Sequence, residues 1–460
     1  MFTVENVVRG TQGALVGGDL AIPVSGVSID TRTLAVGAAF FAIHGQNDGH
    51  RFLRDAVARG AACLVVDTLP DDLPTTVPVV LVDETTRALG RFAAYHRARF
   101  TVPVAAVTGS NGKTTTKELM AGALRALGPV LKPEGSFNNQ WGLPLTLLQI
   151  TAAHRAVVLE IGTNHRGEIA ALAALARPTV AAVTVVSTAH TEYLGSLDEV
   201  AVEKGDLVAA IPPEGAVVLN ADDARVAGMR ARSRARVLTV SARGEADVRA
   251  TDVVERPDGA ITVTLEARGR RQATRLAFAG RHNVVNVLCA AGVGLALGVP
   301  LPEIAAGLET ARPVKGRSVW REAGGVRILD DTYNANPASV KAALETLKSA
   351  RGARRLLVVL GDMLELGDLA PAAHREMGEA VARAGAAEFV GVGRHALTAV
   401  DAARAAGLGE AHHTTTFEDT VALLLKRLAA GDAVLVKGSR GMRMERVVDA
   451  LLARLGGEDG

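Results

Sequence analysis

The chain has 460 residues, 48% of them hydrophobic, which is enough for about three domains with sizeable cores. Lysine plus arginine number 51 and aspartate plus glutamate 49, so the formal charge is +2. This balance argues against a nucleic-acid-binding or membrane-surface protein, because such proteins usually carry a basic excess or patch. Without a signal-peptide pattern or an apolar run of about 20 residues, we expect a cytoplasmic protein with no membrane insertion. Cys63 and Cys289 lie in apolar stretches and are expected to be reduced core residues.

Residues 1–100 are predicted to form a first α/β unit. Residues 84–99 carry apolar side chains at helical spacing and predict a helix. Short apolar runs predict strands at residues 26–29, 39–43, 62–66 and 77–82.

The second predicted unit, residues 101–312, alternates strand and helix patterns, which favours βαβ units and a mainly parallel sheet. After a predicted turn at residues 256–259, apolar and polar side chains alternate, which indicates an antiparallel hairpin. A buried helix over residues 283–297 is predicted to close the unit. The alternating segments before the hairpin are residues 102–107, 114–127, 156–160, 168–176, 180–186, 197–210 and 216–219.

The third predicted unit, residues 313–460, again alternates strands with helical patterns. This predicts a second doubly wound, Rossmann-like sheet, so the predicted fold class is three-domain α/β. The strands are expected at residues 326–329, 356–360, 389–392 and 433–436.

The most informative motif follows the first strand of the second unit. The loop at residues 109–112 contains two glycines, and Lys113 and Thr114 follow it. Glycines let backbone N–H groups approach phosphate oxygens, a lysine here can reach the β/γ-phosphates, and the threonine hydroxyl can hold Mg²⁺. The motif therefore predicts a nucleoside triphosphate site, although Val107 stands where the strict motif has glycine. The alternative is an ordinary strand–turn–helix with an exposed lysine.

Further polar residues lie at predicted strand ends, where open α/β sheets bind ligands. Glu160 ends one strand and His190 follows another, so both could meet Thr114 around Mg²⁺. Histidine is a less usual Mg²⁺ ligand, and a backbone-bonded histidine is the alternative for His190. Lys204 lies on an otherwise apolar helix, where its spacing alone indicates a solvated charge cluster.

Several polar loops have competing interpretations. Asn138 and Asn139 could bind substrate or simply form a turn, and Asn283 could read a base edge or cap a helix. The stretch 330–337 follows a strand and would be costly to bury without partners, which favours a site over a plain loop. Residues 437–441 form an anion-friendly turn.

Together these stretches resemble the Mur ligase family, the ATP-dependent enzymes that build the stem peptide of peptidoglycan, over essentially the whole chain. Residues 330–337, 361–367 and 437–441 are most similar to the member that joins D-alanyl-D-alanine to UDP-N-acetylmuramoyl-tripeptide. The resemblance implies an acyl-phosphate intermediate, release of ADP and phosphate, two Mg²⁺ ions and a monomer. The alternatives are a sibling that adds a single amino acid, folylpolyglutamate synthetase, or an ATP-binding switch without ligase chemistry.

The resemblance also implies residue roles. Lys113, Lys204 and His190 would be catalytic, with Lys204 carbamylated, and the metal ligands would be Thr114, Glu160, His190 and Lys204. ATP would be bound by Gly109, Ser110, Asn111, Gly112, Lys113, Thr114, Asn283, Arg317 and Asp331. The UDP-linked substrate would contact Ser28, Asp30, Thr31, Arg32, Gly45, Asp48, His50, Asn138, Asn139, Thr163, Asn164 and His165. The dipeptide and phosphate would lie near Asn334, Asn336, Lys437, Ser439 and Arg440.

Overall fold

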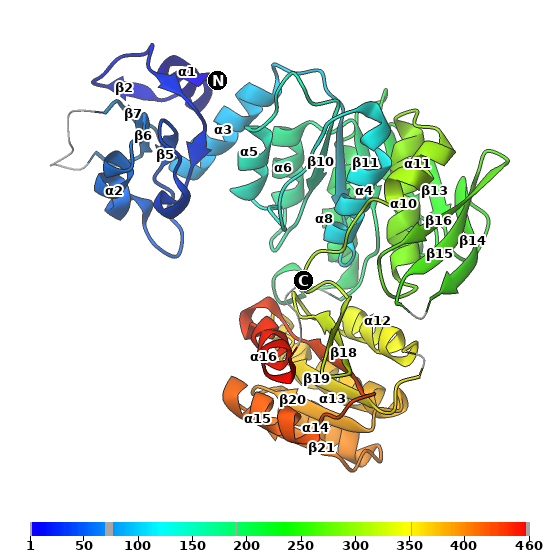
Figure 1. Ribbon diagram of the computed structural model, residues 1–460. Coiled ribbons are helices and arrows are strands. Elements are labelled where there is room, and N and C mark those ends of the chain that lie inside the picture. Colours follow the sequence, from blue (N-terminus) through cyan, green and yellow to red (C-terminus); the bar gives the residue numbers. More distant parts are fainter. Residues whose placement is uncertain (1, 70–76, 189–190, 257, 351, 457–460) are drawn as a thin grey trace.

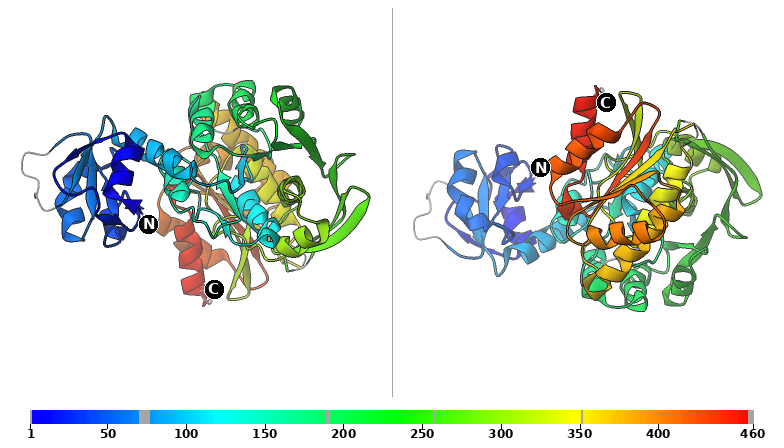
Figure 2. Two further views of the ribbon diagram at one scale, coloured as in Figure 1. Left: turned by 90° about the horizontal axis from the view of Figure 1, so that it is seen from above. Right: turned by 90° about the horizontal axis from the view of Figure 1, so that it is seen from below.

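The computed structural model of the protein describes residues 2–69, 77–188, 191–256, 258–350 and 352–456. Figure 1 shows an N-terminal unit in blue, a central unit in cyan and green, and a C-terminal unit in yellow to red. Both views of Figure 2 show the blue unit projecting to one side, and Figure 1 shows the C-terminal unit beneath the central unit.

The N-terminal unit is built on a mixed sheet with strand order β2-β7-β6-β5-β4. Its parallel strands are β4 (Val27–Ser28), β5 (Ala39–Phe41), β6 (Cys63–Val66) and β7 (Val79–Leu81). The remaining elements are α1 (Val4–Thr11), α2 (Leu53–Ala58), the antiparallel edge strand β2 (Ala14–Val16), and the paired strands β1 (Phe2–Thr3) and β3 (Pro23–Val24). The parallel strands bring the loops after β4, β5 and β6 to one edge of the sheet.

Helix α3 (Thr85–Arg97) joins the N-terminal unit to the central unit. Its first turn is capped by the Glu84 carboxylate, which accepts hydrogen bonds from two backbone N–H groups at 2.6 and 2.8 Å. Near its last turn, Arg97 donates to the carbonyl oxygen of Ala176 at 3.1 Å, at the end of α6 (Glu168–Ala176). The helix therefore fastens the two units together.

The central sheet has the strand order β16-β15-β14-β13-β12-β11-β8-β10-β9. Its parallel strands are β8 (Val104–Thr108), β9 (Val130–Leu131), β10 (Ala156–Glu160), β11 (Val180–Val183), β12 (Ala216–Asn220), β13 (Arg236–Ser241) and β14 (Val248–Glu255). The strands β15 (Ile261–Ala267) and β16 (Arg270–Leu276) extend β14 as an antiparallel meander. Besides α6, the helices are α4 (Lys113–Ala123), α5 (Gly142–Leu147), α7 (Thr191–Leu194), α8 (Leu197–Ala209), α9 (Ala224–Gly228), α10 (Asn283–Ala296) and α11 (Leu301–Leu308).

Strand β8 is buried on both faces. Val104 and Ala106 pack in the core with α5, α6 and α8, whereas Ala105 and Val107 pack in the core with α4, α10 and α11. A parallel sheet covered by helices on both faces needs apolar residues throughout its strands. This explains both the continuous apolar run in the sequence and the valine at position 107.

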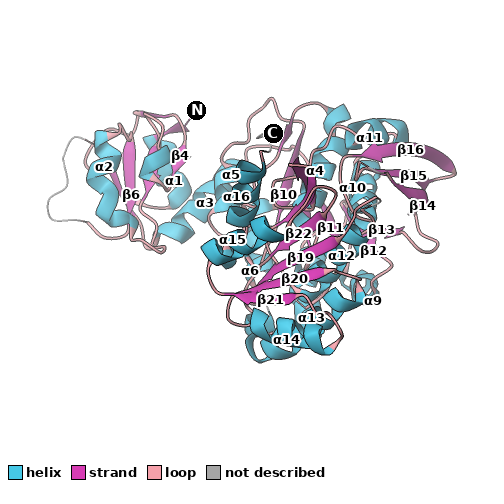
Figure 3. Cartoon of the chain, turned by 60° about the horizontal axis from the view of Figure 1, so that its bottom comes forward, coloured by secondary structure: helices cyan, strands magenta, loops and turns pink. Residues whose placement is uncertain are grey.

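The C-terminal sheet has the order β17-β18-β22-β19-β20-β21, with only the β17–β18 pair antiparallel among these described strands. Its strands are β17 (Val319–Ala323), β18 (Val326–Asp331), β19 (Leu356–Gly361), β20 (Glu388–Val392), β21 (Ala411–Thr414) and β22 (Ala433–Lys437). Helices α12 (Pro337–Lys348), α13 (Ala370–Arg383) and α14 (Ala396–Ala405) cover one face, and α15 (Phe417–Arg427) and α16 (Glu445–Leu455) cover the other. Figure 3 shows strands enclosed by helices in this way, which confirms the α/β fold class.

Most of the strongly patterned elements were predicted, and β10 and α6 have the predicted bounds. The antiparallel hairpin was predicted too, but it is a three-strand meander, and Pro257 of the predicted turn lies outside the described residues. Helices α1, α2 and α11 and strand β17 were not predicted. None of the described helices is long and apolar enough to cross a membrane.

Candidate active site

The phosphate-loop motif occupies the turn between β8 and α4. Gly109 and Gly112 have φ angles of +149° and +83°, a region that side chains other than glycine rarely adopt. A Cβ atom on Gly112 would lie 2.2 Å from Asn286 Oδ1, so this position also has no room for a side chain. No side chain of the described chain caps α4, which leaves its first N–H groups directed at the loop. The turn therefore has the form of an anion-binding helix N-terminus.

A polar cluster surrounds the first turn of α4. Lys113 Nζ donates to the carbonyl oxygen of Gly109 at 2.9 Å, and Thr114 Oγ1 donates to Glu160 Oε2 at 2.8 Å. Glu160 is 1% exposed and also accepts from Asn138 Nδ2 at 2.7 Å. Burial lowers the pKa of Lys113, while the nearby Glu160 carboxylate opposes this shift. Lys113 is therefore not the exposed, unbonded lysine that the alternative interpretation expected.

The strand order explains this convergence. β8 lies between β10 and β11, and all three run parallel, so Thr108, Glu160 and Val183 end at the same edge of the sheet. The P-loop leaves this edge directly after Thr108.

Lys204 was assigned from spacing to a solvated charge cluster, and that interpretation is wrong. Its side chain is 2% exposed, and Nζ makes no hydrogen bond to any residue in the described part of the chain. Burial, with the nearby charge of Lys113, lowers the pKa of Lys204 to about 7, while the Glu203 carboxylate opposes this shift. The adjacent Glu203 faces α6 instead, where it accepts from the backbone N–H groups of Gly167 and Ile169 at 2.7 and 2.9 Å.

His190, the remaining predicted metal ligand, lies outside the described residues. The other predicted ligands fit Mg²⁺ in kind, because the Thr114 hydroxyl and the Glu160 carboxylate are hard oxygen donors. The buried Glu160 carboxylate needs a nearby positive charge. The Arg317 guanidinium comes near it, because Arg317 Nη2 donates to Thr114 Oγ1 at 3.1 Å. Arg317 Nε has no hydrogen-bond partner among the described atoms, so the site has a donor that a ligand could use.

The C-terminal unit contributes a second buried cluster at the ends of β18 and β22. Lys437 is 2% exposed, forms an ion pair with the Asp331 carboxylate and donates to the carbonyl oxygen of Asn334 at 2.8 Å. Asp331 Oδ1 also accepts from the backbone N–H of Ser318 at 2.9 Å. Burial lowers the pKa of Lys437, and Asp331 opposes that shift. The positive charge of Lys437 is therefore already balanced by the Asp331 carboxylate.

Two contacts join the P-loop to the C-terminal unit. The side-chain amides of Asn111 and Asn336, 225 residues apart, donate to each other at 3.3 and 2.8 Å. Arg317, which donates to Thr114, also lies over the ring of Tyr333 at 3.8 Å from its centroid. These contacts bring both units to one cleft of about 1670 Å³.

The cleft gathers most of the predicted site residues. Those that line it are Ser110, Asn111, Gly112, Lys113, Thr114, Asn138, Asn139, Glu160, Thr163, Asn164, Asn283, Arg317, Asp331, Asn334, Asn336, Lys437 and Arg440. Those that lie outside its lining are Ser28, Asp30, Thr31, Arg32, Gly45, Asp48, His50, Gly109, His165, Lys204 and Ser439.

The outlying predicted residues have identifiable contacts. His165 Nδ1 lies 3.1 Å from Glu168 Oε1, and Ser439 Oγ accepts from the Leu364 backbone N–H at 2.8 Å. The predicted uridine-site residues 28–32 and 45–50 follow β4 and β5 at one edge of the N-terminal sheet. Gln46 of the second loop does line the cleft, which brings this edge within reach of it.

Asn283, at the start of α10, makes side-chain hydrogen bonds to other residues of the central unit. Its Nδ2 donates to the Ala279 carbonyl at 2.7 Å, and its Oδ1 accepts from Asn286 Nδ2 at 2.8 Å. Asn286 is the residue beside Gly112. Sequence reasoning also missed Ser136 and Ser187, which contact Thr114 and Asn111 respectively. Short hydroxyl residues in loops offer no spacing that would have marked them.

The fold and this site define a class: multidomain α/β proteins in which a P-loop at the carboxyl edge of a parallel sheet faces a second doubly wound unit. Residues 107–294 match the model of the Mur ligase middle domain, and residues 316–440 match that of the Mur ligase, glutamate ligase domain. The chain is 37% identical over 465 residues to UDP-N-acetylmuramoyl-tripeptide–D-alanyl-D-alanine ligase of Escherichia coli (strain K12), with 98% of each chain covered.

Solved structures give the same result. MurF from Acinetobacter baumannii aligns with a TM-score of 0.89 at 31% identity, covering 98% of this chain and 99% of that chain. MurF ligase from Thermotoga maritima in complex with ADP aligns with a TM-score of 0.81 at 26% identity, covering 95% and 99%. The chain belongs to the Mur ligase family.

Proposed function

We propose that this protein is the ATP-dependent ligase that joins D-alanyl-D-alanine to UDP-N-acetylmuramoyl-tripeptide in peptidoglycan precursor synthesis. The observation that carries the proposal is that the P-loop and the strand ends of the C-terminal unit line the same cleft. Near-full-length similarity to relatives with this printed name supports the choice of reaction. The ADP complex of the T. maritima relative supports ATP as the nucleotide.

The reaction has two steps. The γ-phosphoryl group of ATP passes to a carboxylate oxygen of the tripeptide, which gives an acyl phosphate and ADP. The amine nitrogen of the dipeptide then attacks the acyl carbon, phosphate leaves, and the amide bond forms. Such chemistry depends on positioning and on neutralisation of phosphate charge, so a cleft that gathers cations from two units is suited to it.

The P-loop residues would bind and orient ATP. Lys113 would exchange its bond to the Gly109 carbonyl for the β/γ-phosphates, while the N-terminal N–H groups of α4 hold phosphate oxygens. Arg317 is placed to add positive charge beside Thr114, and its stacking on Tyr333 fixes the guanidinium plane. Asp331 and Asn283 would lie on the nucleotide side of the cleft.

Thr114, Glu160, His190 and a carbamylated Lys204 would hold two Mg²⁺ ions, which neutralise phosphate charge when bound. The environment of Lys204 supports the modification, because only a neutral amine attacks CO₂, forming an N–C bond and releasing a proton. With a pKa of about 7, a large share of Lys204 is neutral near physiological pH. An ordinary exposed lysine is almost entirely protonated there.

Asn138, Asn139, Thr163 and Asn164 line the cleft on the side of the UDP-linked substrate. On the opposite side, Arg440 would bind the dipeptide carboxylate. Lys437 is buried and paired with Asp331, whereas the Arg440 side chain is 61% exposed, pairs at the surface with Glu445 and lies 5.5 Å from the centroid of the Tyr333 ring. The proposal includes a monomeric enzyme that works in the cytoplasm, where ATP is supplied.

The test is whether ADP release requires both substrates. With ATP and Mg²⁺ present, sustained ADP turnover should require UDP-N-acetylmuramoyl-tripeptide and D-alanyl-D-alanine together. A nucleotide switch would give the same basal hydrolysis with or without them, and that result would overturn the proposal.

A further inference from the structure

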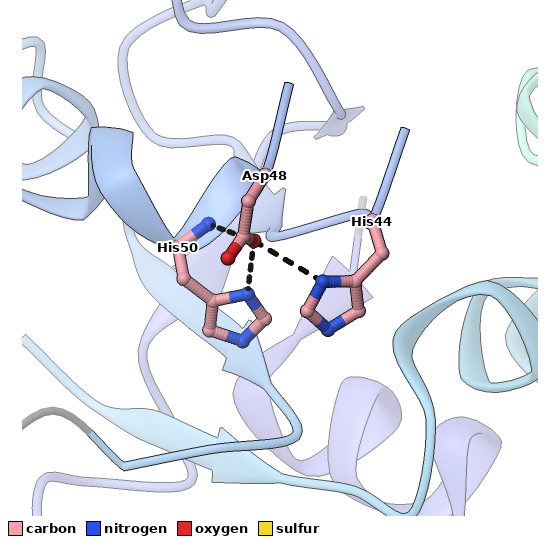
Figure 4. Close-up of side chains that lie close together, drawn as sticks. All are labelled: His44, Asp48 and His50. Atoms are coloured by element: carbon pink, nitrogen blue, oxygen red, sulfur yellow. Dashed lines mark hydrogen bonds and ion pairs between the residues drawn. The ribbon is translucent and has the colours of Figure 1, made fainter. Parts of the chain in front are cut away.

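A cluster of histidine and carboxylate groups lies at the edge of the N-terminal sheet, outside the lining of the cleft. Asp48 Oδ1 is 3.2 Å from His44 Nδ1 and 2.9 Å from His50 Nδ1. One nitrogen or oxygen atom of each of these three residues lies within 4.8 Å of the others. Figure 4 shows both imidazole rings directed at the Asp48 carboxylate.

A fourth residue, Asp67, holds the far side of both rings. Its Oδ1 lies 3.1 Å from His44 Nε2 and 3.2 Å from His50 Nε2. Asp67 Oδ2 is also 3.1 Å from His44 Nε2, and the Asp67 backbone N–H approaches His50 Nε2 at 3.4 Å. The two rings stack with their centroids 4.8 Å apart. Each histidine therefore lies between two carboxylates.

The scaffold makes this arrangement rigid. His44, Asp48 and His50 follow β5, Asp67 follows β6, and these strands are parallel neighbours in register from Ala39 with Cys63 to Phe41 with Val65. Asp48 Oδ1 also accepts from the His50 backbone N–H at 3.0 Å, which fixes the carboxylate. The side chains of His44 and Asp48 remain 50% and 44% exposed, so a solvent ion can reach them.

The hydrogen bonds leave a position for a cation at the centre. His44 Nε2–H donates to Asp67, so the His44 Nδ1 lone pair faces the Asp48 carboxylate at 3.2 Å. Two acceptors at this distance repel one another unless a proton or a metal ion lies between them. His50 Nε2 accepts from the Asp67 backbone N–H, so its Nδ1–H donates to Asp48, and a metal ion at the centre would shift that proton to Nε2, which lies 3.2 Å from Asp67 Oδ1.

We propose that His44, Asp48 and His50 form a binding site for a divalent transition-metal ion of the zinc type, with Asp67 orienting both histidines. Two imidazole nitrogens and a carboxylate oxygen suit Zn²⁺ or Co²⁺ better than Mg²⁺. Ligand atoms of a tetrahedral zinc site lie about 3.4 Å apart, given bonds of about 2.0–2.2 Å. Metal-bound histidines almost always donate their other N–H to a carboxylate, which is the position of Asp67.

The ion is not required by the proposed ligase reaction, and it would have a solvent-facing fourth position. It shares Asp48 and His50 with the loop predicted to meet the uridine nucleotide, while His44 was not part of that prediction. His44 is therefore the residue whose substitution tests the metal without altering the predicted substrate contacts.

The experiment is a Co²⁺ titration of the full, tag-free chain at about pH 8. Excess Mg²⁺ occupies oxygen-rich sites in the cleft, and the visible absorption bands of Co²⁺ report nitrogen ligation and low coordination number. We expect saturable binding of one Co²⁺ per chain, displaced by Zn²⁺. Buried Cys63 and Cys289 cannot compete as ligands.

His44→Asn should weaken Co²⁺ binding by at least about 100-fold, and Asp67→Asn by about 10–100-fold. His154→Asn is the matched control, because His154 contacts Thr151 rather than a carboxylate and should bind Co²⁺ like the wild type. His44→Asn should keep the melting temperature and the ADP-forming activity.

Two results would overturn the metal site. One is the absence of saturable Co²⁺ or Zn²⁺ binding by the wild type, which would mean that the cluster holds protons only. The other is unchanged affinity and spectrum in both His44→Asn and Asp67→Asn. Neither result depends on whether the chain ligates a dipeptide, so failure of this proposal and failure of the ligase proposal are distinguishable.

Discussion

The central and C-terminal units each bury a lysine to the same extent but in opposite electrostatic settings. In the central unit, whose P-loop and β10 end form the central wall of the cleft, Lys204 of α8 lies outside the cleft lining, is 2% exposed and hydrogen-bonds to none of the described residues. On the C-terminal wall, at the ends of β18 and β22, Lys437 is also 2% exposed but pairs with Asp331. Burial without a partner favours a neutral, reactive amine, whereas burial with a partner gives a structural ion pair.

The largest effect is expected on the central wall, for Lys113→Ala. Loss of the phosphate-binding cation should lower the rate of ADP formation by about 10³-fold, because this charge acts in a desolvated site. The melting temperature should stay near that of the wild type, since among the described residues Lys113 hydrogen-bonds only to the Gly109 carbonyl. Lys341→Ala, which removes an exposed lysine of α12, is the control and should keep full activity. Normal turnover by Lys113→Ala would remove the P-loop from the mechanism.

Next in size is Lys204→Ala, which should lower turnover by about 10²-fold. A short added carboxylate such as formate or acetate should restore part of the activity by filling the space left by a carbamate. Full activity of Lys204→Ala without rescue would make this lysine a structural residue like Lys437.

Varying the pH tests the same comparison between Lys204 and Lys437, because it changes the neutral fraction of Lys204. This pKa of about 7 lies below the ordinary lysine value of 10.5, so the neutral fraction rises as pH increases through 7. At a fixed concentration of dissolved ¹³CO₂, a carbamate signal in the ¹³C NMR spectrum should therefore rise steeply from pH 6 to 8, because the neutral amine increases about tenfold and carbamate formation also releases a proton. The signal should vanish in Lys204→Arg. A signal that falls with pH would contradict the burial of an unpartnered amine.

Lys437→Met should lower the free energy of unfolding, and not only the rate of ligation. It leaves the Asp331 carboxylate without its buried cation, and breaking one side of such a pair costs about 3–5 kcal/mol of unfolding free energy. Urea unfolding measures this loss, and Lys348→Met on the exposed end of α12 is the control. The double variant Lys437→Met with Asp331→Leu should recover part of the stability. Unchanged stability of the single variant would mean that Asp331 has another cation.

A smaller effect is expected for Arg440→Gln. The KM for D-alanyl-D-alanine should rise by about tenfold, with little change in the KM for ATP, because one charge-assisted contact to the dipeptide carboxylate is lost. Arg446→Gln, whose arginine lies over Phe417 away from the cleft, should leave both constants unchanged. An equal rise in both KM values would identify Arg440 as a phosphate contact instead.

Local patterns predicted the strands and helices of the central sheet because buried parallel strands are apolar throughout and amphipathic helices have a fixed period. β8, β10 and α6 are of this kind. The burial of Lys204 could not be predicted, since it depends on how α8 packs beside the P-loop rather than on the helix sequence. The Asn111–Asn336 amide pair could not be predicted either, because it joins side chains 225 residues apart through domain packing. Helix α11 was missed although it packs against α4 and β16, because its short segment follows directly on the longer pattern of α10.

The most direct test of the account is which amine the enzyme ligates. ATP, Mg²⁺ and UDP-N-acetylmuramoyl-tripeptide are incubated in parallel with D-alanyl-D-alanine, glutamate, lysine or diaminopimelate, and products are weighed by mass spectrometry while ADP is quantified. We predict one product, the amide of D-alanyl-D-alanine, formed in equal amount to ADP. Efficient ligation of a single amino acid, with none of the dipeptide, would contradict the account and move the chain to a sibling Mur ligase.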